Sequence, residues 1–284
     1  MKVDVKAISA FTIDGQGGNI AGVVLDADQY TAQEKQQIAA NANFSETVFV
    51  SNSGMADFKL DFYTPIMQIA HCGHATIATF SYLKANGRIC GNNSSKQTVD
   101  GIREIFFEGE LAFMEQKPQK WEYYPNISEI ASSLNIAEKD IKGSPVIVNT
   151  GNSFLIVEAF SQKQLADIMP DFKQITDISE KNGLIGFYLF VKTPESDAIA
   201  TTRMFAPFYG IDEESATGMA AGPLAWWLYL QDPAIGKEFM IRQGDFMEVP
   251  SSSNLHVIIN RGINTPNIFV GGSGSFMYNL VVEI

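Results

Sequence analysis

Three side chains in the first half of the chain have the types needed for proton transfer or nucleophilic chemistry. Glu46 stands among apolar neighbours that include Phe44 and Val48, and Cys72 lies two residues before His74. A buried carboxylate can take a proton and return it, because burial raises its pKa from about 4.3 toward about 6–7. Glutamate is rarely buried, however, so the local pattern by itself favours a solvated Glu46 over one in a dry pocket.

His74 opens a run of almost wholly apolar or small residues over 74–83, which stops at Gly87. This run predicts a buried helix that begins at Gly73 and ends at a glycine stop. The first N–H groups of a helix and the positive end of its dipole face whatever precedes it, and such an end binds carboxylate or phosphate. We therefore expect an anion site with His74 at its edge, although a histidine at a helix start also commonly bonds to backbone.

Cys72 has several possible roles. It could be a small buried residue, a nucleophile paired with His74, or a metal ligand together with His71 and His74. The pair is weak because side chains two residues apart seldom meet at a helix start. The metal site lacks a fourth ligand at a suitable spacing. We expect neither a metal nor a cofactor.

The glycine loop at residues 14–19 lacks the spacing of a dinucleotide fingerprint and the lysine of a P-loop, which excludes nucleotide binding by these motifs. It is either a tight turn or a place where backbone approaches a ligand closely.

The elements that must position these residues follow from alternation and capping signals. Thr31 and Glu34 form a capping box that starts a helix over 31–41. Further helices are predicted at 74–83, 127–134, 165–169 and 219–230, and strands at 3–11, 21–25, 44–50, 58–62, 102–107, 111–114, 145–149, 154–159, 185–191, 198–205, 239–243, 255–260, 268–271 and 276–283. Residues 92–95 are predicted to form a polar loop, and 117–125 a crossing between domains.

The second half repeats the plan of the first. A strand ending in Pro65, a polar turn and a buried helix are echoed by a strand ending at Pro207, an acidic turn and a second buried helix. The echo indicates a duplicated domain, with domains at 1–117 and 118–275 and a final strand near 276–284 that can return to the first. If the halves are related, both helix starts should face one another across an interdomain cleft, where Glu214 would join His74 and Glu46.

Composition limits the class of protein. The 284 residues carry a net charge of −12 with a pI near 4.7 and no cluster of Lys or Arg, which argues against nucleic acid or an anionic membrane as partner. Two cysteines in a chain of this length favour a reducing compartment. No apolar run approaches the ~20 residues of a membrane span, and the first residues do not resemble a signal peptide. These features predict a cytoplasmic protein.

Several motifs, taken in order, resemble the phenazine-biosynthesis isomerase-like (PhzF-like) family, which is related to diaminopimelate epimerase. The residues that carry the resemblance are Phe11-Thr12, Gly17-Gly18-Asn19, Ala21-Gly22-Val23, Ser45-Glu46-Thr47, Cys72-Gly73-His74-Ala75-Thr76, Arg203, Phe205-Ala206-Pro207, Gly210, Glu213, Ala216-Thr217-Gly218 and Gln243-Gly244. The match covers essentially the whole chain.

The resemblance implies an α+β fold of two pseudo-symmetric domains, each a central helix wrapped by a curved, mostly antiparallel sheet. It implies a cofactor-independent isomerase or epimerase of a small carboxylate-bearing metabolite, and a homodimer, which is common in the family. Glu46 would move the proton, and His74 and Glu214 would contact the substrate. The expected catalytic residues are Glu46 and His74, and the expected substrate-binding residues are Gly18, Asn19, Gly73, Ala75, Thr76, Glu214, Ala216, Thr217 and Gly218.

The chain departs from the family pattern at the second helix start. Glu214 stands in place of Asp, Ser215 in place of Pro and Met219 in place of Ser. These changes leave an alternative, a family member that has lost catalysis and serves as a ligand-binding or scaffold protein. A thiol enzyme using Cys72 is a third reading. Two-thiol racemisation is rejected because no cysteine precedes the second helix.

Overall fold

The computed structural model describes residues 1–116, 120–260 and 267–284. The chain divides into two compact units, unit 1 with residues 1–115 and 271–284, and unit 2 with residues 116–270. The expected division lay at 117/118, with a strand near 276–284 returning to the first domain. In the structure the chain re-enters unit 1 at Gly271. That the two units are the epimerase-like domains expected at 1–117 and 118–275 stays a prediction.

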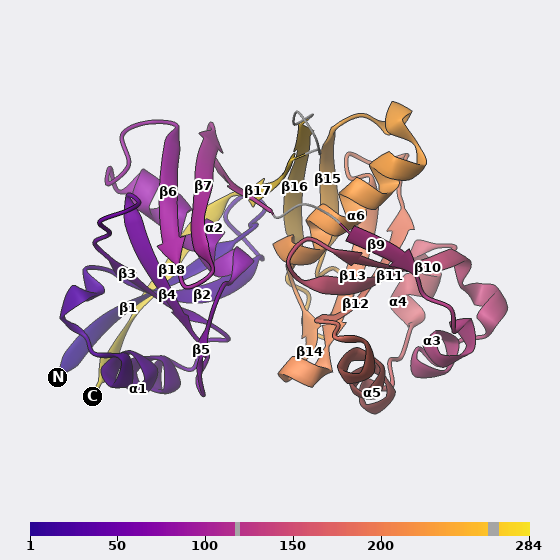
Figure 1. Ribbon diagram of the computed structural model, residues 1–284, viewed down its shortest axis with the longest axis horizontal. Helices are drawn as coiled ribbons and strands as arrows, with labels where there is room; N and C mark the ends of the chain where they lie inside the picture. Colours follow the sequence, from indigo (N-terminus) through magenta and orange to yellow (C-terminus); the bar gives the residue numbers. More distant parts are fainter. Residues whose placement is uncertain (117–119, 261–266) are drawn as a thin grey trace. The chain divides into compact units, whose positions relative to one another are not determined.

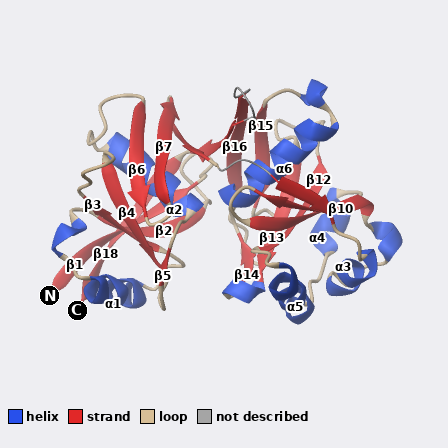
Figure 2. Cartoon of the chain, viewed as in Figure 1, coloured by secondary structure: helices blue, strands red, loops and turns tan. Residues whose placement is uncertain are grey.

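Unit 1 is a mixed sheet with two helices (Figures 1 and 2). Its strands are β1 (Lys2–Ala10), β2 (Asn19–Val24), β3 (Thr47–Ser51), β4 (Phe58–Tyr63), β5 (Gln68–Ile69), β6 (Asn93–Thr98), β7 (Gly101–Glu108), β8 (Leu111–Glu115) and β18 (Gly274–Glu283). The pairs run β18-β1-β2-β3-β4-β6-β7-β8, and β2–β3 and β4–β6 are the parallel ones. Lys2 pairs with Glu283, so the two ends of the chain lie side by side.

The central element of unit 1 is helix α2 (Gly73–Ala85), which is buried at nearly every position of its first three turns. A helix that is apolar all round must be buried on all sides. It contacts β18, β1, β2 and β3 from one end of the strand order and β8 from the other, so the sheet curves around it. Helix α1 (Ala32–Ala42) packs outside, and both bonds of its expected capping box form between Thr31 and Glu34.

Unit 2 has a sheet of the same kind and more helices. Its strands are β9 (Lys120–Tyr123), β10 (Lys142–Asn149), β11 (Ser153–Glu158), β12 (Gly186–Lys192), β13 (Ala200–Ala206), β14 (Ile211–Glu214), β15 (Glu238–Gln243), β16 (Ser253–Asn260) and β17 (Asn267–Gly272), which leads back to unit 1. Its helices are α3 (Ile127–Ser133), α4 (Gln162–Asp167), α5 (Phe172–Asn182) and α6 (Gly218–Gln231). The buried helix here is α6, which contacts β10, β11 and β16.

The two units share one topology. In unit 1 the directions of successive strand pairs alternate: β1–β2 is antiparallel, β2–β3 parallel, β3–β4 antiparallel and β4–β6 parallel. In unit 2 the pairs β10–β11, β11–β12, β12–β13 and β13–β15 repeat the same sequence of directions. The buried helix follows β5 in one unit and β14 in the other, so each helix start lies at an equivalent point of its own unit.

Some sequence predictions were wrong. Residues 93–95 of the expected polar loop belong to strand β6, and residues 120–123 of the expected crossing form strand β9, which pairs with β10. Residues 117–119 of that crossing lie outside the described residues. Helix α5 was not predicted, although Asp171 caps its start and Gly183 ends it. Pro223 lies inside α6, beyond its first turn.

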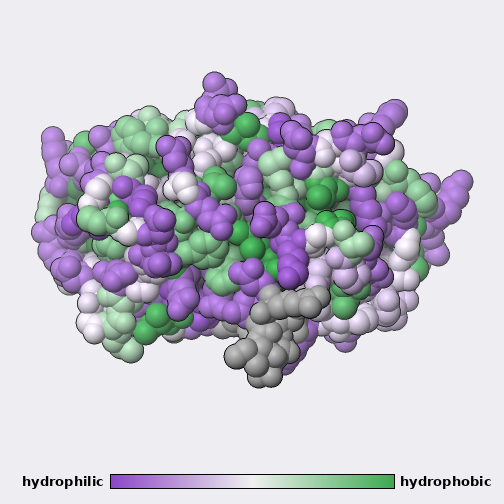
Figure 3. Space-filling model, turned by 90° about the horizontal axis from the view of Figure 1, so that it is seen from above, coloured by the Kyte–Doolittle hydropathy of each residue, from purple (hydrophilic) through white to green (hydrophobic). Residues whose placement is uncertain are grey.

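The surface mixes polar and apolar side chains. On the face shown in Figure 3, hydrophilic residues are interspersed with smaller hydrophobic areas. Among the described residues, no helix is both long and apolar enough to cross a lipid bilayer.

Candidate active site

Glu46 lies in the short segment that connects α1 to β3. Only 8% of the surface of Glu46 is exposed, so the prediction of a solvated Glu46, which the local pattern favoured, is wrong. The backbone explains this placement. Gly22 of β2 donates its N–H to the Glu46 carbonyl (2.9 Å), and Thr47 begins the parallel pairing of β3 with β2. The carboxyl group is thereby held at the entrance of a central parallel pair.

His74 is the second residue of α2 and is buried (4% exposed). Its Nε2 lies 3.2 Å from Glu46 Oε2. The two groups come from segments 28 positions apart, and both side chains are almost without solvent contact. The structure therefore brings together the two residues expected to be catalytic, at the N-terminal end of the buried helix.

Cys72 completes a chain of three groups. Its Sγ lies 3.5 Å from the other ring nitrogen, His74 Nδ1, so the expectation that side chains two residues apart would not meet here was wrong. Cys72 is the N-cap of α2 and has an extended backbone (φ −141°, ψ 126°). An N-cap side chain turns back over the first helical turn, which is how it reaches His74.

The charges in this cluster follow from burial and proximity. Burial alone would raise the pKa of Glu46, as the sequence suggested, but the His74 imidazolium outweighs burial and lowers it overall. Burial opposes charge on His74 as well, yet Cys72 and Glu46 together raise the pKa of His74 well above its ordinary value. Burial raises the pKa of the Cys72 thiol. The directions for Glu46 and His74 favour a carboxylate beside an imidazolium, a pair in which one group can accept a proton and the other can donate one.

The same three residues are close enough together to be considered as metal ligands, since their ligand atoms lie within 4.8 Å of one another. The thiol, however, approaches Nδ1, whereas the carboxylate approaches Nε2. An ion bound to one ring nitrogen would have one of the other two donors across the ring from it. The geometry fits a linear arrangement of thiol, imidazole ring and carboxylate better than a chelate. His71 lies outside this chain, with its Nδ1 3.1 Å from Lys96 Nζ.

The other residues expected in unit 1 lie on the elements around this cluster. Gly73, Ala75 and Thr76 form the first turn of α2, and all three are buried. Gly18 and Asn19 lead from the glycine loop into β2, the strand that flanks Glu46. Gly18 has φ +82°, and a Cβ added there would lie 2.4 Å from the Ala10 carbonyl oxygen, so the loop requires glycine at this point.

The residues expected in unit 2 gather at the start of α6. Thr217 is its N-cap, and its hydroxyl donates to Glu214 Oε2 (2.5 Å). Gln243, wholly buried on β15, donates to the Glu214 carbonyl (2.7 Å) and accepts from the Thr217 N–H (3.1 Å). Ala216 and Gly218 complete this buried turn. The expectation that these residues face Glu46 and His74 stays a prediction.

Glu213 and Glu214, adjacent in the sequence, do different things. Glu213 forms two 2.8 Å bonds with the buried Arg203, so its carboxylate stabilises the fold. Glu214 bonds to the helix start and is partly exposed. The first acid thus fixes strand β14 to β13, and the second remains the candidate for contact with a ligand.

Sequence reasoning missed Lys96. This lysine is fully buried on β6, and its Nζ donates to Thr76 Oγ1 (2.7 Å) in the first turn of α2. Lys96 follows two serines and precedes Gln97, a polar pattern that is typical of a loop. Because a loop was predicted at 92–95, the next residue was not expected to be buried.

The fold and the site define a class of protein. Two units of one topology, each with a buried helix, and a buried carboxylate–histidine pair at the start of one of these helices indicate an acid–base enzyme. Comparison with known proteins agrees with this class. The family model described as phenazine biosynthesis-like protein matches residues 8–278, and the chain belongs to this family.

Relatives support the same assignment. The chain is 33% identical over 242 residues to an uncharacterized isomerase, YddE, of Salmonella typhimurium, with 80% of each chain covered. It is 27% identical over 255 residues to trans-2,3-dihydro-3-hydroxyanthranilate isomerase of Pseudomonas aeruginosa, with 86% of each covered. A Bacillus anthracis protein of the PhzF family has the same fold, with a TM-score of 0.92 at 23% identity and full coverage of both chains.

Proposed function

We propose that the protein is a cofactor-independent isomerase or epimerase of a small carboxylate-bearing metabolite, with Glu46 as the group that moves the proton. The observation that carries the proposal is the buried Glu46–His74 pair, 3.2 Å apart at the start of a buried helix. Perturbed titratable groups in a dry site are typical of catalytic acids and bases. Family membership and the names of the curated relatives support the reaction class.

The chemistry follows from the resting charges. The Glu46 carboxylate takes a proton from a carbon next to an unsaturated or carboxylate-bearing centre, and the electron pair moves into the adjacent π-system. The His74 imidazolium and the positive end of the α2 dipole stabilise the negative charge that develops. The proton then returns to another carbon or to the other face of the same carbon, so that no electrons are gained or lost overall. Proton transfer by a positioned group typically contributes about 10²–10⁴-fold.

The remaining residues take binding roles in this proposal. Gly73, Ala75 and Thr76 would bind one carboxylate at the α2 turn, and the backbone of Gly18 and Asn19 would approach the substrate. Glu214 and the turn 216–218 would form the substrate contacts supplied by unit 2. We also propose that the protein is cytoplasmic and forms a homodimer. Light scattering of the purified chain would test the dimer.

A binding or scaffold protein remains the second candidate. Met219 occupies the second position of α6, and its sulfur lies 3.9 Å from Gln116 Nε2, so this turn lacks the hydroxyl that the family pattern would place there. Such a protein would bind a carboxylic acid without exchanging its protons.

Solvent deuterium incorporation separates these functions. The wild type, Glu46→Gln and Cys72→Ala would be incubated in deuterium oxide with trans-2,3-dihydro-3-hydroxyanthranilate, L-proline, trans-4-hydroxy-L-proline and aromatic amino acids, and the acids then examined by NMR. The proposal expects incorporation by the wild type and by Cys72→Ala, and none by Glu46→Gln. Thermal stabilisation by one of these acids without incorporation would favour the binding protein. Incorporation that survives Glu46→Gln but not Cys72→Ala would assign the reaction to the thiol.

A further inference from the structure

Unit 1 contains two buried lysines with different surroundings. Lys35 is 7% exposed, and its Nζ lies 2.7 Å from Asp61 Oδ2, which is an ordinary buried ion pair. Lys96 has no exposed surface, and among the described residues no carboxylate oxygen lies within ion-pair distance of its Nζ. Burying an amino group without a counter-charge costs free energy, and burial lowers the pKa of Lys96 well below its ordinary value. A hydrophobic side chain of similar volume would fit this place at lower cost.

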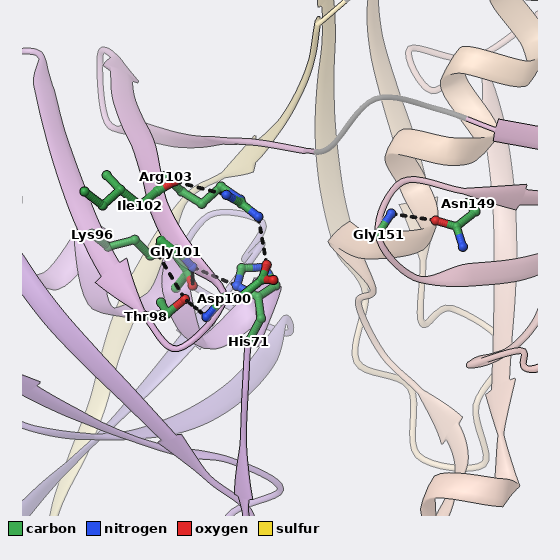
Figure 4. A network of polar contacts seen from close by, with 10 residues as sticks. His71, Lys96, Thr98, Asp100, Gly101, Ile102, Arg103, Asn149 and Gly151 are labelled. Atoms are coloured by element: carbon green, nitrogen blue, oxygen red, sulfur yellow. Dashed lines mark hydrogen bonds and ion pairs between the residues drawn. The ribbon is translucent and has the colours of Figure 1, made fainter.

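The contacts of Lys96 point toward the proposed active site. Its Nζ donates to Thr76 Oγ1 (2.7 Å), lies 3.1 Å from His71 Nδ1 and stands 5.2 Å from the centre of the Phe62 ring. Figure 4 shows Lys96 with His71 and the tip of the β6–β7 hairpin, where Arg103 bonds to Asp100. His71 is in the segment that leads into α2, and Thr76 is in the first turn of that helix.

The bond to Thr76 continues to the first peptide group of the helix. The Thr76 hydroxyl, which accepts from Lys96, donates to the Cys72 carbonyl oxygen (2.6 Å). A trans peptide group is planar, so a carbonyl fixed toward the helix directs the following N–H, that of Gly73, in the opposite direction. The chain from Lys96 through Thr76 to Cys72 therefore sets the direction of an N–H group that the proposed function uses.

We propose that Lys96 is a positioning residue, which orients the first turn of α2 through Thr76 and the segment before it through His71. This inference rests on the proposed function, because the turn that Lys96 orients is the one that would stabilise charge on the substrate. Lys96 itself is closed off from solvent and acts only through these two neighbours.

The proposal separates stability from function, which gives a test that needs no substrate. In Lys96→Met the apolar side chain keeps most of the packing, so we expect an unchanged or higher melting temperature. In the same variant the Gly73 amide resonance and the His71 ring ¹⁵N resonances should move. The matched control Lys35→Met leaves Asp61 buried beside Lys59 alone, so it should lower the melting temperature without moving these resonances. Unmoved Gly73 and His71 resonances in Lys96→Met, or a melting temperature below that of Lys35→Met, would overturn the proposal.

Kinetics test the same role with the acid that the wild type exchanges. A misplaced helix turn should lower kcat by about 10²-fold in Lys96→Met, with a smaller change in KM. Thr76→Val removes the hydroxyl that joins Lys96 to the Cys72 carbonyl and keeps the lysine. The variant with both substitutions should therefore have a kcat no lower than that of Lys96→Met alone. Full additivity of the two substitutions would refute action through Thr76. If the wild type exchanges none of the acids, the proposed function fails for them, and the resonances still decide the role of Lys96.

Discussion

The buried clamp between Arg203 and Glu213 predicts a large effect on stability. The guanidinium group forms two 2.8 Å bonds with the carboxylate, and its Nη1 donates to the carbonyl oxygens of Leu165, Ala166 and Ile168 (2.8–3.3 Å). The side chains of Arg203 and Glu213 are 8% and 15% exposed. Arg203→Met would therefore leave a buried carboxylate and several carbonyl groups without their partner.

Removing one partner of a buried pair costs about 3–5 kcal/mol. Unit 2 spans residues 116–270, for which unfolding carries an entropy of roughly 0.33 kcal/mol/K at about 2.1 cal/mol/K per residue. If unit 2 unfolds cooperatively, its melting temperature should fall by roughly 9–15 °C. Differential scanning calorimetry measures this shift directly.

Arg242→Met provides the matched control within the same unit. Arg242 pairs with Asp245 at 3.1 Å, but its side chain is 36% exposed, and exposed pairs contribute only about 0–1 kcal/mol. We expect a shift of no more than about 3 °C for this variant. Equal shifts for the two variants would refute the view that burial of the Arg203 clamp determines its contribution.

Three further predictions concern unit 1. The pKa of His74 should fall in Glu46→Gln, because Glu46 is one of the two groups that raise it. A ¹⁵N NMR titration of the ring would show its midpoint at lower pH than in the wild type, and an unmoved midpoint would contradict the prediction. Because the folded state lowers the pKa of Glu46, this group stabilises the fold above pH 4.5, and the contribution is lost as the pH falls through the folded-state pKa. Because the folded state raises the pKa of His74, this group stabilises the fold below pH 6.5, and the contribution is lost as the pH rises through the folded-state pKa. The stability difference between wild type and Glu46→Gln, measured by urea unfolding, should accordingly be greatest between pH 4.5 and 6.5. Gly18→Ala should destabilise by about 1–3 kcal/mol because of its positive φ and close carbonyl, more than Gly87→Ala, which has φ +70° but open space around it; equal effects would mean that the close contact is relieved without cost.

The sequence predicted most elements because their signals are local. The capping box at Thr31 and the apolar run over 74–83 gave helices with nearly the observed ends, and both are patterns that one segment carries by itself. Family resemblance selected Glu46 and His74, which the structure places 3.2 Å apart. Local reasoning alone favoured a solvated Glu46, because the parallel pair that buries it joins segments far apart in the chain.

The errors have the same origin. Residues 93–98 look like a loop because they are mostly polar, yet pairing with β4 and β7 makes them a strand, and its pattern of alternating burial places Ser94, Lys96 and Thr98 inside. The amphipathic helix α5 has a capping residue, Asp171, at its start and Gly183 at its end, so the signals for it were present and were missed.

The pKa of Glu46 shows why neighbours in space decide chemistry that neighbours in sequence only suggest. Apolar residues beside Glu46 in the sequence suggested that burial would raise its pKa. The structure adds one group, the His74 ring, and reverses the sign. Cys72, the N-cap of α2, lies beside the other ring nitrogen of His74, and Cys72 and Glu46 both raise the pKa of the ring. Under the proposed function, the carboxylate is therefore the form of Glu46 that meets the substrate, and the reaction would begin with removal of a proton.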